Sequence, residues 1–146
     1  MKVVVQRVKR ASCIVEGNTV SSISHGYLLL VSFTHKDSVE EITKMARKIA
    51  YLRIFEDENG KMNKSIIDVN GEILSISQFT LYANPYTGNR PSFTDCMYHK
   101  IAIGLYEQFN KILNEEYKIK TLPGMFGEDM KLDVLLDGPV TINLEF

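Results

Sequence analysis

One stretch of this chain limits its fold more than any other, a continuous apolar run from Gly26 to Phe33. The run holds three consecutive leucines and lacks the alternation of a half-exposed strand, so it predicts a strand buried on both faces. Before it, Lys2 to Glu16 alternates between two faces and predicts a long strand. Gly17-Asn18 predicts a hairpin turn, and Thr19 to Ile23 the returning strand.

Two helices and further strands are predicted in the rest of the chain. Asp37 or Ser38 caps a first helix that has apolar residues at helical spacing. A second helix is predicted from Asp95 to Glu116, with an apolar stripe at Ile101, Ala102, Leu105, Phe109, Ile112 and Leu113. The remaining predicted strands are Leu52–Phe55, Glu72–Leu81, Leu132–Leu136 and Val140–Phe146. Strands dominate without a regular βαβ repeat, so the class is α+β.

Composition describes an ordinary globular chain. At 146 residues, with 45% hydrophobic and 24% charged residues, residues 1–146 are expected to form a single domain. No apolar stretch approaches the roughly 20 residues of a membrane helix, and no signal peptide is visible. The two cysteines, Cys13 and Cys96, are too few for a disulfide framework, which fits a reducing, cytoplasmic location. Cys96-x-x-His99 lacks the second half of a zinc motif, so no metal is expected.

Charge is distributed unevenly along the chain. Residues 1–64 hold 11 basic and 7 acidic side chains, whereas residues 65–146 hold 6 and 11, although the overall net charge is only −1. A basic half can meet a phosphate backbone. A solvated surface of mixed charge is the simpler interpretation.

The segment Ser77-Gln78-Phe79-Thr80-Leu81 places polar side chains at the end of an otherwise apolar predicted strand. Strand alternation would put Gln78 and Thr80 on one face, with Ser77 and Phe79 on the other. Buried polar groups without partners cost about 1–3 kcal/mol each. Either a pocket for a polar substrate or the neighbouring backbone must therefore supply partners.

A second segment, Asp137-Gly138-Pro139-Val140-Thr141, puts Gly-Pro between two apolar runs. Its simplest interpretation is a turn between two strands, and X-Pro bonds adopt the cis form far more cheaply than other peptide bonds. The usual catalytic motifs of hydrolases and nucleotide-binding proteins are absent. The three histidines, His25, His35 and His99, are most simply surface residues.

Together the two segments resemble the paired signature of the D-aminoacyl-tRNA deacylase (D-tyrosyl-tRNA deacylase) family. Similar residues recur over nearly the full chain, at Gln6-Arg7-Val8 with Ala11-Ser12, Arg53-Ile54-Phe55, Gly60-Lys61-Met62-Asn63, Arg90-Pro91-Ser92-Phe93 and Gly124-Met125-Phe126. The resemblance implies a β-barrel-like mixed sheet flanked by two helices and assembled as a homodimer.

The resemblance also implies the activity and the site. The expected reaction is hydrolysis of the ester bond of D-aminoacyl-tRNA, as a chiral proofreading step, with glycyl-tRNA also cleaved and no cofactor. Ser77, Gln78, Phe79 and Thr80 match the active-site strand. Gly138 and Pro139, followed by Val140 and Thr141, match an element with a cis bond that reaches into the partner subunit and excludes L side chains by shape. Arg7 is expected to hold that element.

Two mechanisms remain open at this point. Thr80 can act as nucleophile, but it needs a base and none stands near it in sequence. The alternative, which we prefer, is that the neighbouring ribose hydroxyl of the tRNA activates water, while backbone N–H groups near Phe79 and Thr80 stabilise the oxyanion. Phe79, Tyr82 and Phe93 are candidates for an apolar slot for the terminal adenine.

The chain departs from the family pattern at two positions. Leu136 stands where the family usually has Asn two residues before Gly-Pro, which removes one polar anchor for that element. Met125 stands where many members have Arg.

Two competing functions remain. The first is a non-catalytic nucleic-acid-binding module that uses the basic N-terminal half. The second is a hydrolase that acts on another small ester or amide.

Overall fold

The computed structural model describes all residues, 1–146, and its fold is built around one curved sheet. Six strands form it, in the order β2-β1-β3-β6-β7 with β8 against β1: β1 Lys2–Val15, β2 Asn18–Ile23, β3 Gly26–Ser32, β6 Glu72–Ser77, β7 Thr121–Pro123 and β8 Lys131–Glu145. One edge of β1 pairs antiparallel with β3 and then with β2, and its other edge pairs antiparallel with β8. β6 is parallel to both β3 and β7, so the sheet is mixed.

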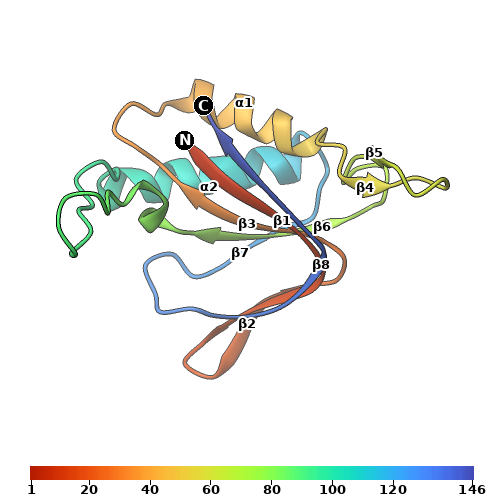
Figure 1. Ribbon diagram of the computed structural model, residues 1–146, viewed down its shortest axis with the longest axis horizontal. Helices are drawn as coiled ribbons and strands as arrows, with labels where there is room; N and C mark the ends of the chain where they lie inside the picture. The colour runs from red at the N-terminus through yellow and green to blue at the C-terminus, as the bar shows by residue number, and fades with distance from the viewer.

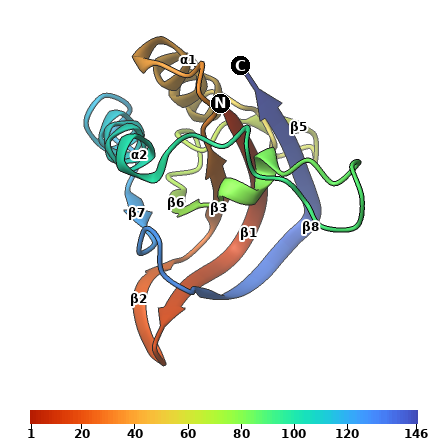
Figure 2. The ribbon, with the colours of Figure 1, turned by 90° about the vertical axis from the view of Figure 1, so that its left-hand side faces the viewer.

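The two helices cover one side of this sheet. α1 (Val39–Ala50) and α2 (His99–Glu115) lie together above the strands, while β2 and half of β8 curve away from them (Figure 1). Turned by 90°, the sheet is nearly closed and barrel-like, with β1 and β8 running side by side along its wall (Figure 2). The α+β class and the two flanking helices are therefore as predicted. Neither helix is long and apolar enough to cross a membrane.

The apolar run that begins at Gly26 is buried on both faces, as predicted. Tyr27, Leu29 and Val31 belong to a core of 22 buried residues between the sheet and the helices. Leu28, on the opposite face, belongs to a second core of 8 buried residues inside the curved half of the sheet. Alternation along a strand thus supplies both cores from one segment.

The first helix begins where the sequence predicts it. The Ser38 hydroxyl accepts from the Glu40 amide, and Glu41 reaches back to the Ser38 amide, which completes a capping box. The predicted start of the second helix at Asp95 is wrong, because α2 begins at His99. The backbone from Asp95 to Met97 instead bonds to the end of β3, where Met97 N donates to Phe33 O.

Several predicted strand limits are also wrong. The strand that begins at Glu72 ends at Ser77 rather than at Leu81, and residues Phe79–Tyr82 form a 3₁₀ turn, η1. Leu132–Leu136 and Val140–Phe146 are parts of one strand, β8, so Gly138-Pro139 is a bulge within a strand and not a turn between two.

Local turns and short strands account for the other differences. The hairpin turn is formed by Glu16 and Gly17 rather than by Gly17 and Asn18. Glu16 and Gly17 both have positive φ, which matches the twist of the two strands that they connect. The strand expected over Leu52–Phe55 is confined to β4 (Phe55–Glu56), which pairs with β5 (Met62–Lys64). β7 was not predicted, since three residues are too short for a periodic pattern.

The apolar stripe of α2 gives a matched test of the core. Phe109 is 0% exposed, whereas Ile101, predicted for the same stripe, is 54% exposed. We expect Phe109→Ala to lower the free energy of unfolding by about 3–5 kcal/mol, from lost burial and the cavity left behind. Ile101→Ala is expected to change it by less than about 1 kcal/mol. Urea denaturation of both variants measures this, and equal losses would contradict the packing described.

Candidate functional site

A cavity of about 840 Å³ lies at the end of the sheet where β3 and β6 stop. Its walls come from the ends of these strands, η1, the segment leading into α2, and the loop that precedes β8. Ser77, Gln78 and Phe79 line it, together with residues far away in the sequence such as Phe126 and Met130. Three of the predicted catalytic residues thus meet one cavity.

The strand stops at Ser77 because the backbone turns at the next residue. Gln78 has φ −141° and ψ 79°, and its amide donates to Val31 O at 2.7 Å, after which no further ladder bond to β3 follows. Strand alternation therefore does not extend to Phe79 and Thr80. The side chains of Gln78 and Thr80 nevertheless lie together, since they are hydrogen-bonded to each other. Ser77 and Gln78 are half-buried, whereas Phe79 and Thr80 are exposed.

Two side chains donate hydrogen bonds to the carbonyl of the peptide unit between Phe79 and Thr80 and fix its orientation. The Phe79 carbonyl accepts from Ser32 Oγ at 3.3 Å and from Cys96 Sγ at 3.1 Å. In a trans peptide the N–H points opposite to the carbonyl, so these two donors also fix the direction of the Thr80 amide. The Phe79 and Thr80 amides are the first two N–H groups of η1, and the first N–H groups of a helical turn have no partner within it. Two adjacent N–H groups are therefore free for an external acceptor.

The Thr80 hydroxyl has one polar neighbour, which is an amide. Gln78 Nε2 donates to Thr80 Oγ1 at 2.6 Å. An amide donor orients the hydroxyl, but it cannot remove its proton. No histidine, carboxylate or lysine is hydrogen-bonded to Thr80, and its side chain lies outside the lining of the cavity. This geometry lacks the base that a threonine nucleophile requires.

Aromatic rings surround the cavity. Phe79 and Phe93 meet with ring centroids 5.2 Å apart, and both line it. Tyr82, the third candidate for an adenine slot, does not line it, and its ring lies 4.4 Å from Lys2 Nζ. Phe79 and Phe93 therefore remain as the aromatic candidates.

Two of the histidines assigned to the surface lie at this cavity. His35 and His99 are exposed, but both belong to its lining. His35 contacts Tyr98, with ring centroids 5.0 Å apart, and His99 contacts Phe126 at the same separation. Sequence reasoning missed these residues because parts of the chain that are far apart in sequence meet at the cavity: the loop after β3, the start of α2 and the loop before β8. No local pattern records that.

Arg7 lies far from the cavity, at the bulge in β8. Its side chain is only 5% exposed. Nη1 donates to Ile54 O at 2.7 Å and Nε to Asp137 O at 3.2 Å. The Gly138–Pro139 peptide bond is cis, and a Cβ built on Gly138 would lie 3.2 Å from Arg7 Nη2. Arg7 thus contacts the Gly138-Pro139 bulge directly.

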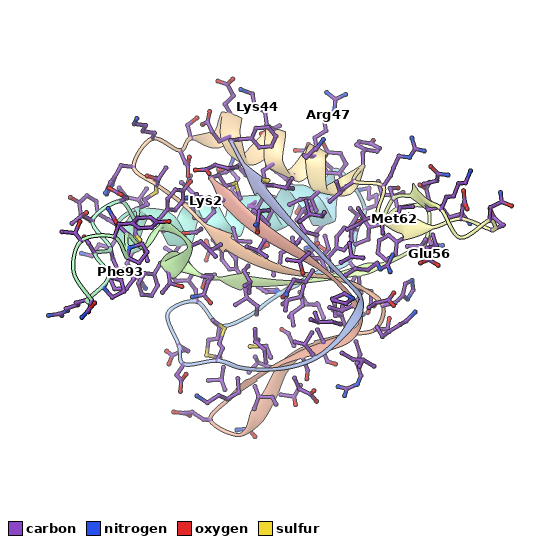
Figure 3. The ribbon with its side chains drawn as sticks, viewed as in Figure 1. Lys2, Lys44, Arg47, Glu56, Met62 and Phe93 are labelled. Carbon is purple, nitrogen blue, oxygen red and sulfur yellow. The ribbon has the colours of Figure 1, made fainter.

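Strand register separates this bulge from the cavity. Ser77 lies beside Val31, which pairs with Val3. Arg7 is four residues further along β1, and Gly138 lies beyond β1 on β8. With a rise of about 3.3 Å per residue and strands about 4.8 Å apart, the two places are about 20 Å apart along the sheet. Figure 3 agrees, since Phe93 and Glu56, which lie beside Phe79 and Arg7 respectively, are at opposite ends of the molecule. One chain does not bring the two predicted halves of the site together.

Val140 and Thr141 follow the bulge on β8. Val140 is half-buried and packs against the larger core, whereas Thr141 is exposed and pairs with Gln6. Neither residue lines the cavity described above.

The fold is shared with solved structures. A protein described as a c-Myc DNA Unwinding Element Binding Protein superposes with a TM-score of 0.95 at 43% identity, covering 100% of this chain and 99% of that one. A probable eukaryotic D-amino acid tRNA deacylase superposes with a TM-score of 0.82 at 15% identity, covering 98% of both chains. Together with the cavity, this likeness defines an α+β protein of the deacylase fold.

The sequence comparison identifies the family. The family described as D-Tyr-tRNA(Tyr) deacylase matches residues 4–145. A D-aminoacyl-tRNA deacylase of Geobacillus sp. is 50% identical over 145 residues, covering 99% of this chain and 95% of the relative. The enzyme of that name from Lactobacillus acidophilus is 51% identical over 146 residues, covering 99% of both chains. The chain belongs to the D-Tyr-tRNA(Tyr) deacylase family.

Cys96 offers a chemical reporter of the cavity. Burial, with a smaller effect from the neighbouring Asp95 carboxylate, raises the pKa of the Cys96 thiol above its ordinary value of 9.0. Because the thiolate is the reactive form, we expect slow reaction with a disulfide reagent at pH 8, with a rate that rises through a midpoint above pH 9. Asp95→Asn is expected to lower that midpoint. Cys96→Ala is the control, since Cys13 is 0% exposed; a midpoint below pH 9 would contradict this environment.

Proposed function

We propose that this protein hydrolyses the ester bond of D-aminoacyl-tRNA and releases free tRNA and D-amino acid. The reaction is a chiral proofreading step in translation quality control. The observation that carries the proposal is the pair of free amides at Phe79 and Thr80, at the edge of a cavity in a chain of this family. Residues 1–146 are taken to act as one deacylase domain.

The proposed chemistry uses the substrate itself as the base. Water adds to the ester carbonyl carbon, and the neighbouring 2′-hydroxyl of the terminal ribose relays the proton: it accepts the proton of the water while its own proton moves to the 3′-oxygen. The negative charge that develops on the carbonyl oxygen is stabilised by the Phe79 and Thr80 N–H groups. The bond to the 3′-oxygen then breaks, and that oxygen leaves as a hydroxyl. This route needs no cofactor, and it agrees with the lack of a base beside Thr80.

The motif side chains then act by orientation. The Thr80 hydroxyl accepts from Gln78, so its own proton is free to contact the ester. Ser77 and Phe79 line the cavity, where Phe79 and Phe93 give an apolar wall for the terminal adenine. Orientation of a bound ester removes much of the entropic barrier to water attack.

Selectivity for the D form is assigned to a second copy of the chain. In a homodimer with composite sites, Gly138 and Pro139 of one subunit would face the cavity of the other. This is supported by their separation of about 20 Å from the cavity of their own chain. It is also supported by exposed apolar residues on β8, where Leu135 is 50% and Leu136 is 42% exposed.

A rigid backbone wall made by this element excludes an L side chain by shape. Val140 and Thr141 continue the wall, and Arg7 holds it. Glycine has no side chain for such a wall to exclude, so glycyl-tRNA is a second substrate. Because aminoacyl-tRNA is the substrate, the protein is proposed to act in the cytoplasm and to need no membrane.

A second candidate function is non-catalytic DNA or RNA binding. It is favoured by the name of the similar DNA Unwinding Element Binding Protein and by the basic N-terminal half. Ion pairing argues against it, because six of the 11 basic residues in that half pair with carboxylates: Lys2, Arg7, Lys9, Arg10, Lys44 and Lys64. Paired cations offer less charge to a phosphate backbone.

Side-by-side deacylation separates the two functions. We expect the protein to release amino acid from D-Tyr-tRNA and Gly-tRNA and to leave L-Tyr-tRNA intact, because only the L side chain meets the wall. Release of labelled amino acid measures all three. Folded protein that releases no D-Tyr at micromolar concentration, yet binds nucleic acid with a steep salt dependence, would replace the first function by the second.

The role of Thr80 is tested by substitution in enzyme and substrate. If Thr80 orients the ester, Thr80→Ala is expected to lower kcat by about 10–100-fold, as the loss of one oriented contact does. A tRNA that lacks the terminal 2′-hydroxyl is expected not to react. Single-turnover assays measure both. An acyl-enzyme trapped on Thr80 would refute the RNA-assisted route.

A further inference from the structure

The pairing of β1 with β8 is interrupted at two adjacent places, one on each strand, and the carboxylate of Asp137 contacts both. On β8, residues 137–140 stand opposite Arg7 alone, since Gln6 pairs with Thr141 and Val8 with Leu136. On β1, Lys9 has no pairing partner on β8, since Val8 pairs with Leu136 and Arg10 with the next residue, Leu135. Asp137 Oδ2 lies 3.2 Å from Arg7 Nε and 3.3 Å from Lys9 Nζ. The Asp137 side chain therefore connects the bulge in β8 to both Arg7 and Lys9 on β1.

The ion pair between Asp137 and Arg7 is the more important of these two contacts, because Arg7 is buried. A guanidinium that is only 5% exposed needs a compensating charge, because removal from water disfavours a cation. Its backbone acceptors, Ile54 O and Asp137 O, are neutral. The other carboxylate near it, Glu56, is 59% exposed and 3.9 Å away. Asp137 is therefore the main counter-charge of Arg7.

Lys9 contributes less. Its side chain is 62% exposed, and exposed ion pairs contribute little because water screens them. The hollow of about 260 Å³ beside these residues is lined by Arg7, Lys9, Glu56 and Asp137 among others. Two cations and two carboxylates there cancel, so the hollow has no net charge to attract an anion. The cluster is suited to holding the backbone rather than to binding a ligand.

We infer that Asp137 is a positioning residue that fixes the direction of the Gly138-Pro139 bulge through Arg7, with Lys9 as a weaker second support. The inference rests on the proposed function for its catalytic consequence. In this chain Leu136 offers no polar group beside the bulge, and the carboxylate of the next residue takes that role. If the Gly138-Pro139 bulge varies more in position, the wall that it is proposed to form in the partner's cavity no longer has one fixed shape around the amino-acid side chain.

Kinetics of Asp137→Asn test the inference, because this variant removes the charge and keeps the size. We expect kcat on D-Tyr-tRNA to fall roughly tenfold with KM within about twofold, and the preference for D over L to narrow. Lys9→Ala is expected to lower kcat by less than about fivefold, as for an exposed pair. Asp137→Glu, which keeps the charge, is expected to recover most of the activity. If the Glu variant is no better than the Asn variant, the inference is overturned.

A matched control lies further along the same pair of strands, three residues from Arg7 on β1 and four from Asp137 on β8. Arg10 and Asp133 form an exposed pair at 3.0 Å between β1 and β8, away from the bulge. Asp133→Asn is expected to leave kcat and selectivity unchanged. Equal losses in the Asp133 and Asp137 variants would mean that both act through general sheet stability, which overturns the inference.

Amide hydrogen exchange gives a readout that does not depend on activity. In Asp137→Asn we expect faster exchange of the Gly138, Val140 and Thr141 amides and not of the amides at the distant end of β8, whereas Asp133→Asn retains the wild-type rates at these three positions. Unchanged exchange together with unchanged kcat overturns the inference. If the wild-type protein is itself inactive on D-Tyr-tRNA, the proposed function fails, and exchange alone still decides whether Asp137 holds the bulge.

Discussion

The fold depends on the pairing of β1 along both of its edges. On one edge it holds β3 and β2, and on the other it holds β8 from Lys2 to Ile14. Because a shift of one residue would turn Val3, Val5 and Arg7 out of the core, this register is strongly determined. Through it the positions of the cavity and of the Gly138-Pro139 bulge are set relative to each other. Both proposed halves of the site are attached to the same strand.

The one long break in this pairing surrounds a buried cation. Arg7 follows the inward alternation of Val3 and Val5, so its guanidinium enters the core face. Burial of a charge costs several kcal/mol unless partners compensate, and here they are two carbonyl oxygens and the Asp137 carboxylate. The bulge in β8 brings both Asp137 acceptors within reach. The same residues thus compensate the buried charge of Arg7 and set the shape of the Gly138-Pro139 bulge, the proposed selectivity element.

The proposed catalytic centre relies on backbone more than on side chains. The Phe79 carbonyl is fixed by Ser32 and Cys96, which leaves the Thr80 amide pointing away from them. Fixed N–H groups need no reorganisation as charge develops, which is the source of their effect on a transition state. An ester with its own neighbouring hydroxyl needs little else. This explains how a site in which no histidine or carboxylate is hydrogen-bonded to Thr80 is compatible with the proposed hydrolysis.

The sequence alone is enough to predict the α+β class, the doubly buried strand at Gly26, the capped start of α1 and the family, because these follow from short-range periodicity, local capping and motifs read in order. It also marked Ser77, Gln78, Phe79 and Arg7 as unusual polar or motif positions. Long-range contacts, in contrast, place the end of the motif strand at Ser77, since the bond from Gln78 to Val31 closes it. They also make Gly138-Pro139 a bulge, since Arg7 lies opposite and requires acceptors there. Cavity residues from two loops and the start of α2, such as His35, Phe126 and His99, come together through long-range packing that no local pattern encodes.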